Sequence, residues 1–160
     1  MDSVIKQAID LRQAGLFEQS RTLLTSLLND ESYRAIAHLH IAWSHDNEGS
    51  EQQAIVHYLE ALQGTLTIDQ RFDALFGLAS TYRSLGCYTE ALAYFEYTLS
   101  EYPDALEVQP FYAMCLYNVG RHKQATALLL ELLVASSDCK AIKRYQRAIL
   151  LYAQDLDKIW

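Results

Sequence analysis

The sequence predicts an all-α protein made of four helix–turn–helix units followed by one further helix. Three observations predict this fold. The 160 residues include only two prolines and six glycines, so few positions interrupt a helix. Four glycines recur in similar surroundings at separations of 34, 37 and 34 residues, which indicates an internal repeat. Small and bulky side chains also recur at fixed distances from these glycines, which are Gly15, Gly49, Gly86 and Gly120.

The surroundings of each glycine indicate a pair of closely crossing helices. Such helices need small side chains where their backbones approach, with bulky side chains beside the contact. Glycine adopts the left-handed conformation that ends many helices, so each of the four should end the first helix of its unit. Alanine stands seven residues before each glycine, at Ala8, Ala42, Ala79 and Ala113. Small residues stand five positions after, at Ser20, Ala54, Ala91 and Ala125, and bulky ones nine after, at Leu24, Tyr58, Phe95 and Leu129.

This chain length favours a single domain, 1–160. The spacing places the repeats at about 1–34, 35–71, 72–105 and 106–139, and a capping helix at about 138–157. The expected helices span 2–14, 17–29, 33–47, 51–63, 68–84, 88–101, 105–119, 122–135 and 138–157.

Local signals mark two of the helix starts. Thr67 and Gln70 have the spacing of a capping box, so the third unit should begin there. Pro110 conflicts with a straight helix over 105–119, because proline beyond the first turn loses a hydrogen bond and clashes with a preceding carbonyl. We therefore expect that helix either to kink at Pro110 or to begin nearer Val108.

The final helix should be a cap with one apolar and one basic stripe. A terminal repeat must present a polar face to water, and basic residues here supply one. The apolar stripe, expected to pack on the fourth unit, is Ile142, Tyr145, Ile149, Tyr152, Leu156 and Ile159. The basic stripe is Lys140, Lys143, Arg144 and Arg147.

Composition excludes several functions. The net charge of −7 disfavours nucleic-acid binding, which needs clustered Lys and Arg. The three cysteines are far apart, which suits free thiols in a reducing compartment. The first ten residues do not form a signal peptide, and the most apolar run, 125–135, is too short to span a membrane. We therefore expect a cytoplasmic protein without membrane contact.

Neither catalysis nor a cofactor is expected. The sequence has no nucleophile elbow, no phosphate-binding glycine loop and no paired-histidine zinc motif. Four histidines gather in the second unit, but no two are four residues apart, so buried or half-buried roles are favoured over a metal site. They are His38, His40, His45 and His57.

The repeat resembles the tetratricopeptide repeat family, whose unit is a 34-residue helix–turn–helix. The third unit carries the resemblance at Leu78, Ala79, Tyr82, Gly86, Tyr88, Ala91, Phe95 and Pro103. The second unit carries it at Ile41, Ala42, Gly49, Ala54, Tyr58 and Ala61. The first and fourth units depart from the pattern, with Ser32 and Ser137 in place of proline and Gln7 in place of leucine.

The resemblance implies a right-handed superhelix (solenoid) whose first helices line a concave groove for an extended peptide or a partner helix. The groove positions it implies are Asp2, Ile5, Ile9, Arg12, Ile36, Leu39, Trp43, Asp46, Asn47, Asp73, Phe76, Ser80, Arg83, Glu107, Pro110, Met114, Tyr117 and Asn118. Some family members clamp a carboxylate with cationic and amide side chains, but this chain has Ile5, Ile9, His40, Asp73 and Gly77 at those positions.

Two functional interpretations remain open at this stage. The first is an adaptor that binds a protein or peptide with apolar anchors, and with basic side chains that complement the groove acids. The alternative interpretation of the aromatic groove residues is that neighbouring helices bury them. The second is a scaffold that assembles, as a homodimer for example, through the cap helix at Arg144, Arg147, Leu150, Leu151 and Trp160. An RNA-binding helical repeat is disfavoured by the acidic middle of the chain.

Overall fold

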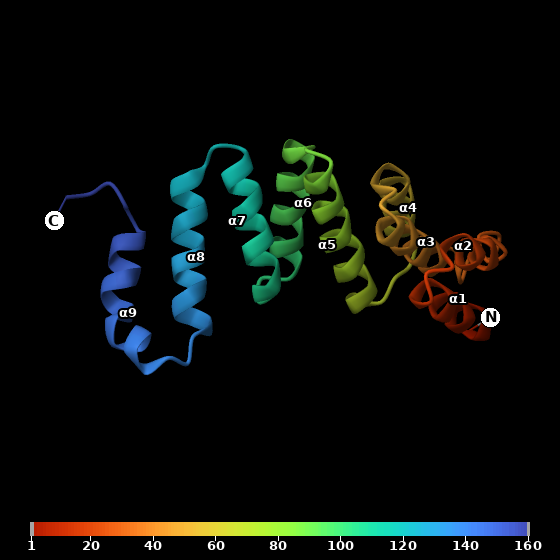
Figure 1. Cartoon of the computed structure of the whole chain (residues 1–160), viewed down its shortest axis with the longest axis horizontal. Helices are drawn as coiled ribbons and strands as arrows, with labels where there is room; N and C mark the ends of the chain where they lie inside the picture. Colours follow the sequence, from red (N-terminus) through yellow and green to blue (C-terminus); the bar gives the residue numbers. More distant parts are fainter. Residues whose placement is uncertain (1, 160) are drawn as a thin grey trace. The chain divides into compact units, whose positions relative to one another are not determined.

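The computed structural model describes residues 2–159, which contain helices and no strand, so the predicted all-α class is confirmed (Figure 1). The helices occur in the predicted order. They are α1 (Asp2–Gln13), α2 (Phe17–Thr25), α3 (Arg34–Glu48), α4 (Glu51–Gln63), α5 (Ile68–Ser84), α6 (Tyr88–Glu101), the 3₁₀ helix η1 (Leu106–Val108), α7 (Gln109–Asn118), α8 (His122–Ser136) and α9 (Lys140–Ala153).

The chain forms two compact units, 1–94 and 95–160, with the boundary inside α6. In the first unit each helix from α1 to α5 packs on the next in the chain, and α3 also contacts both α1 and α5. In the second unit α7 packs on α8, and α8 packs on α9 (Figure 1). Antiparallel neighbours joined by short turns are the arrangement that the repeat spacing predicts.

The four repeat glycines all end a helix in the left-handed conformation. Their φ angles are 78°, 80°, 76° and 81° for Gly15, Gly49, Gly86 and Gly120. At Gly49 the backbone N–H donates to the Asp46 carbonyl, and the next N–H donates to the His45 carbonyl. These bonds satisfy carbonyl groups that the end of α3 would otherwise leave unpaired.

The recurring small residues lie at helix crossings, as their spacing predicts. Ala8, Ala42 and Ala79 are fully buried, and Ser20, Ala54 and Ala91 are at most 1% exposed. In the first pair the hydroxyl of Ser20 donates a 2.7 Å hydrogen bond to the backbone oxygen of Ala8. That contact explains why serine serves at a position where the other units have alanine.

The main core of the first unit gathers around Tyr58, which is 1% exposed. This core consists of Leu39, Ala42, Ala54, Tyr58, Ala61, Ala74 and Leu78, from α3, α4 and α5. Gly77 on α5 faces the tyrosine so closely that an added Cβ would lie 2.7 Å from its hydroxyl oxygen. The absence of a side chain at Gly77 therefore lets α5 approach α4.

The starts of α5 and α7 test the two local signals predicted from the sequence, the capping box and Pro110. The Gln70 backbone N–H donates to Thr67 Oγ1 at 3.2 Å, and the Thr67 N–H donates to Gln70 Oε1 at 3.0 Å, which completes the predicted capping box. Of the two alternatives expected around Pro110, the later start is confirmed, because α7 begins at Gln109, directly after Val108. Pro110 lies in the first turn of α7, directly after η1, because proline is tolerated where the N–H needs no partner.

The apolar stripe predicted for the last helix is only partly buried, so its expected packing on the fourth unit is wrong in part. Ile142 and Ile149 are half-buried, whereas Tyr145 and Tyr152 are 63% and 49% exposed. The helix ends at Ala153, so Leu156 and Ile159 lie beyond it. Within its unit α9 packs on α8, and this contact leaves part of the stripe exposed.

Candidate functional site

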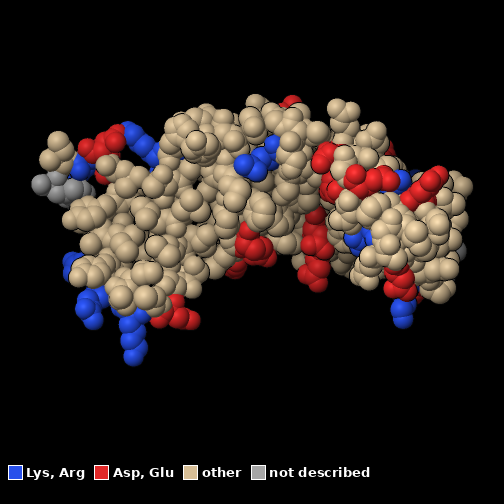
Figure 2. Space-filling model, in the orientation of Figure 1, with Lys and Arg blue, Asp and Glu red and all other residues tan. Residues whose placement is uncertain are grey.

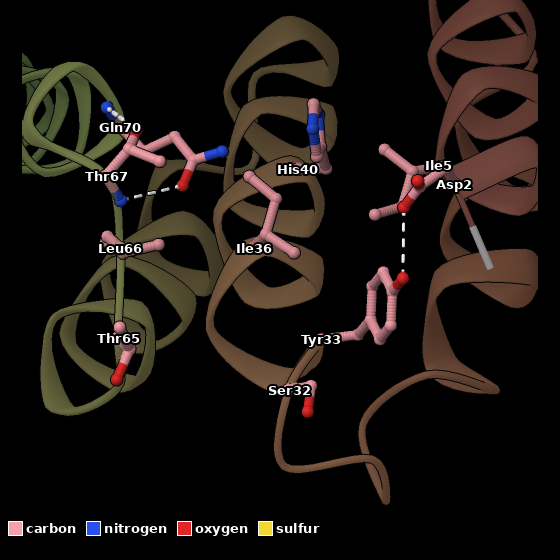
Figure 3. A pocket seen from close by; sticks show the side chains of 10 residues that line it. All are labelled: Asp2, Ile5, Ser32, Tyr33, Ile36, His40, Thr65, Leu66, Thr67 and Gln70. Carbon is pink, nitrogen blue, oxygen red and sulfur yellow. Dashed lines mark hydrogen bonds between the residues drawn. The ribbon is translucent and has the colours of Figure 1, made fainter.

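The first unit has a pocket of about 540 Å³ beside α1, α3 and the segment that leads into α5 (Figure 3). Its walls combine aliphatic side chains with hydroxyl, amide, carboxylate and imidazole groups. The lining residues are Asp2, Ile5, Ser32, Tyr33, Ile36, His40, Thr65, Leu66, Thr67 and Gln70.

Helical periodicity places the pocket beside the groove positions that the sequence implied. Side chains three or four residues apart share one face of a helix. On α1 that face carries Asp2, Ile5, Ile9 and Arg12, and from the start of α3 it carries Tyr33, Ile36, His40, Trp43 and Asn47. We call these nine residues the α1/α3 face.

One end of the α1/α3 face is closed by a hydrogen bond between the two helices. The Tyr33 hydroxyl donates to Asp2 Oδ1 at 3.0 Å (Figure 3). This hydrogen bond, together with the negative charge of the carboxylate, raises the pKa of Tyr33 above its ordinary value. The phenol therefore remains a neutral donor, and Asp2 brings negative charge to the pocket.

The other end of the α1/α3 face carries positive charge. The Arg12 guanidinium carbon lies 5.4 Å from the ring centroid of Trp43, and Arg12 Nη1 donates to Asn47 Oδ1 at 2.9 Å. Burial lowers the pKa of Arg12, but an arginine remains charged at neutral pH. Its Nε is buried and has no hydrogen-bond partner.

His40 lies between these two ends and is only 7% exposed. Its ring packs edge-on against Trp43 with 4.9 Å between centroids, and its buried Nδ1 has no hydrogen-bond partner. Burial, with a smaller contribution from the positive charge of Arg12, lowers the pKa of His40 to about 4. The imidazole is therefore neutral at pH 7.

Asp46 is held by the fold rather than presented to solvent. The Tyr58 hydroxyl donates to its Oδ2 at 2.6 Å, and the Thr81 hydroxyl lies 3.1 Å from both of its carboxylate oxygens. Burial raises the pKa of Asp46, and the two hydrogen bonds partly oppose that rise. Both carboxylate oxygens of Asp46 are therefore engaged within the fold.

The remaining implied positions of the first unit fall into two groups. Leu39 is fully buried in the core and offers no surface to a ligand. Asp73 is exposed, Arg83 is half-buried, and Phe76 is half-buried with its ring 5.8 Å from that of Phe72. Burial and the neighbouring charge of Asp69 raise the pKa of Asp73.

The second unit carries its implied residues separately. Glu107 lies exposed in η1, Met114 and Tyr117 on α7 are 46% and 63% exposed, and Asn118 is half-buried. On α9, Arg144 and Arg147 are exposed, as are Leu150 and Leu151 at 39% and 41%. Lys and Arg side chains gather near the start of this helix (Figure 2). Trp160 lies outside the described residues.

Sequence reasoning missed several pocket residues. Tyr33 stands just before α3, one residue outside the helix, but continues the spacing of Ile36 and His40. Leu66 lies in the segment that connects α4 to α5, where helical periodicity cannot predict which way a side chain faces. The capping box could have indicated that the start of α5 lies near the groove, but not that it lines a pocket.

The histidines of the second helix pair lie close together without forming a metal centre. His38 Nδ1 and His57 Nδ1 are 2.9 Å apart, and the rings of His45 and His57 stack at 5.5 Å. Within residues 2–159 no three side chains of ligand type are placed to hold one ion. No helix in the same range is long and apolar enough to cross a membrane.

Successive helix–turn–helix pairs with glycine-ended first helices define a helical-repeat protein. A family model described as the tetratrico peptide repeat matches residues 35–156. The chain therefore belongs to the tetratricopeptide repeat family, whose members are generally non-enzymatic modules that bind proteins. None of the curated proteins compared with the chain is significantly similar to it. The matched range includes α3 and α5 but begins after α1, so Asp2 and Ile5 lie outside it.

Proposed function

We propose that the chain is a non-enzymatic adaptor whose α1/α3 face, with the start of α5, binds an extended peptide or helix of a partner protein. The observation that carries this proposal is the pocket of about 540 Å³ on that face, next to the half-buried Trp43. A concave site with an apolar lining and a few polar groups is the usual form of a ligand site. Partly exposed aromatic side chains are frequent anchors in protein interfaces.

Charge indicates what kind of partner this surface favours. The positions where a carboxylate clamp needs cations carry Ile5, Ile9, His40, Asp73 and Gly77. The surface therefore offers no such clamp to an acidic carboxyl-terminal tail. Asp2 and Asp73 instead favour a partner that has basic side chains beside its apolar anchors, and the net charge of −7 disfavours nucleic acid. We place this activity in the cytoplasm.

A peptide array tests the proposal with a matched pair of variants. Trp43→Ala removes the indole side chain from the α1/α3 face, while Val56→Ala truncates a 57% exposed side chain of α4 outside that face. We expect peptides with apolar anchors and Lys or Arg to bind the wild type and Val56→Ala, and to lose at least about tenfold in affinity for Trp43→Ala. Circular dichroism establishes that both variants are folded.

Equal binding by all three proteins would contradict a site on the α1/α3 face. The same would follow from an array on which no peptide binds the wild type. Binding restricted to acidic peptides would retain a groove but overturn the partner chemistry.

A second candidate function is self-assembly through α9, which the exposed Leu150 and Leu151 favour. The helix has four basic and no acidic residues, so it complements a protein whose net charge is negative. Light scattering after size exclusion tests this candidate with Leu150→Asp/Leu151→Asp, a change that should convert a dimer into a monomer. A wild-type chain that is monomeric at 100-fold higher concentration than the array experiment would exclude it.

A further inference from the structure

We propose that the pocket lined by Asp2, Ile36 and His40 is a subsite for one lysine or arginine side chain of the bound peptide. This inference rests on the proposed function and specifies which partner residue the pocket accepts. It assigns the aliphatic part of that side chain to the pocket walls and its charged end to the Asp2 carboxylate.

The apolar walls suit a long unbranched side chain. In Figure 3 Ile36 of α3 lies between Leu66, which precedes α5, and Ile5 of α1. Lysine and arginine bury their aliphatic stems along such surfaces and keep the charged group at a polar site. The volume of about 540 Å³ is ample for one such side chain and part of its backbone.

The charge of the pocket selects a cation. Asp2 is the one lining residue that is charged at neutral pH, since His40 is neutral. The Tyr33 bond uses Oδ1 of Asp2, and the described structure gives Oδ2 no partner. A hydrogen bond from an ammonium or guanidinium group to a carboxylate is about twice as strong as a bond between neutral groups.

His40 supplies the second, independent observation. His40 is only 7% exposed and lines the pocket. Its Nδ1 has no hydrogen-bond partner. An apolar side chain would fill this place without the cost of an unsatisfied polar group. A neutral imidazole can accept a hydrogen bond from a donor in the pocket without repelling a cation.

Arg12 does not prevent this occupancy. Asp2 and Arg12 are ten residues apart on α1, which corresponds to about 15 Å along the helix axis. That separation exceeds the screening length of about 10 Å at 0.1 M salt. The guanidinium also contacts Trp43 and Asn47 rather than the Asp2 end.

The start of α5 is a weaker alternative, as a site for an anion. A helix N-terminus attracts negative charge through its exposed N–H groups. Here the Gln70 N–H already donates to Thr67 and the Thr67 N–H to Gln70, so the capping box occupies both. An anion in the pocket would also be repelled by the carboxylate of Asp2, which lines the same pocket.

Titration with blocked amino acids, followed by methyl NMR of the full chain, tests the subsite. The probes are the N-acetyl, N-methylamide derivatives of lysine, norleucine and glutamate. We expect the lysine probe to shift the methyl signals of Ile5, Ile36 and Leu66 with a dissociation constant near 1 mM, a value typical of a ligand of its size. Norleucine should bind at least about fivefold more weakly, and glutamate should cause no shifts.

Two variants that each neutralise one carboxylate of α1 provide the matched control. Asp2→Asn should abolish the preference for lysine over norleucine, while Asp10→Asn should retain it, because Asp10 does not line the pocket. A preference that survives Asp2→Asn, or equal binding of lysine and norleucine to the wild type, would overturn the subsite. A preference for glutamate would also overturn the subsite, and it would support an anion site at the start of α5 instead.

These outcomes are independent of the array experiment. If peptides require Trp43 but the lysine probe shows no preference, the subsite fails and the adaptor proposal stands. If the probe binds as expected but no peptide requires Trp43, the pocket binds a cation and the adaptor proposal fails.

Discussion

The hydroxyl of Tyr58 donates a 2.6 Å hydrogen bond to Oδ2 of Asp46, and this bond joins α4 to α3 inside the first unit. Thr81 of α5 lies 3.1 Å from both oxygens of the same carboxylate. One aspartate therefore links three successive helices. Asp46 itself does not line the pocket.

Removal of the Tyr58 hydroxyl should destabilise the first unit. Tyr58→Phe leaves a half-buried carboxylate with one donor fewer, and hydrogen bonds to charged groups contribute about 1.5–3 kcal/mol. Urea denaturation should show a loss of that size in the free energy of unfolding. The control is Tyr145→Phe, whose 63% exposed hydroxyl should matter by less than about 0.5 kcal/mol. Equal stability of the two variants would contradict the role of the bond.

The repeat spacing predicted the helices but could not predict this aspartate's partners. Asp46 lies three residues before the repeat glycine Gly49, at a repeat position that the family resemblance implied to be a groove acid. Whether a carboxylate turns towards solvent or towards a buried hydroxyl depends on distances between helices, which periodicity does not give. For the same reason Leu39 was assigned to the groove, although it is fully buried.

The candidate site was predictable where it lies on helices. Ile5 and Ile36 follow from the phase of α1 and α3, and both line the pocket. His40 was noted only as a position where a clamp cation is missing and as a buried histidine. Its unsatisfied nitrogen and the pocket beside it arise from packing between α1, α3 and the segment before α5, which has no helical phase.

Gly77→Ala should destabilise the protein, although alanine favours helix by about 1 kcal/mol over glycine. The new Cβ would lie 2.7 Å from the Tyr58 hydroxyl oxygen, so α5 or the tyrosine must move. We expect a net loss of about 1–3 kcal/mol in thermal or urea unfolding. Two ring carbons of Tyr58 would also lie 2.8 and 2.9 Å from this Cβ, so the partner change must remove the ring. Combining Gly77→Ala with Tyr58→Leu should therefore cost less than the sum of the single changes. Strict additivity of the two changes would contradict the close approach.

Stability should fall as the solution is acidified from about pH 6.5 towards pH 4. His40 and His57 have pKa values lowered from 6.5 to about 4, chiefly by burial, so between these values the unfolded chain binds more protons than the folded one. For His40 the loss is up to about 3 kcal/mol. Asp46 acts in the opposite sense, because its raised pKa contributes stability that is lost as pH rises through it. Urea midpoints measured across this pH range give the slope.

His40→Leu separates the stability of the fold from its binding. The variant removes an unsatisfied buried nitrogen, so at pH 7 we expect stability to be unchanged or higher by about 1 kcal/mol. The acid-induced loss should shrink over the same pH window, and the affinity for the blocked lysine should fall. A variant that loses several kcal/mol at pH 7 would show instead that the histidine supports packing.

The crossing of α1 and α2 offers a last prediction, at Ser20. This residue is 1% exposed and donates a 2.7 Å bond to the Ala8 carbonyl oxygen, at a phase where the other three units have alanine. Ser20→Ala should therefore cost no more than about 1 kcal/mol, since the helices still meet at a small side chain. Ser20→Leu should cost at least about 1–3 kcal/mol, because extra methylene groups cannot be accommodated where the backbones approach. Urea unfolding measures both, and a leucine variant as stable as the alanine variant would show that small side chains are not required at this crossing.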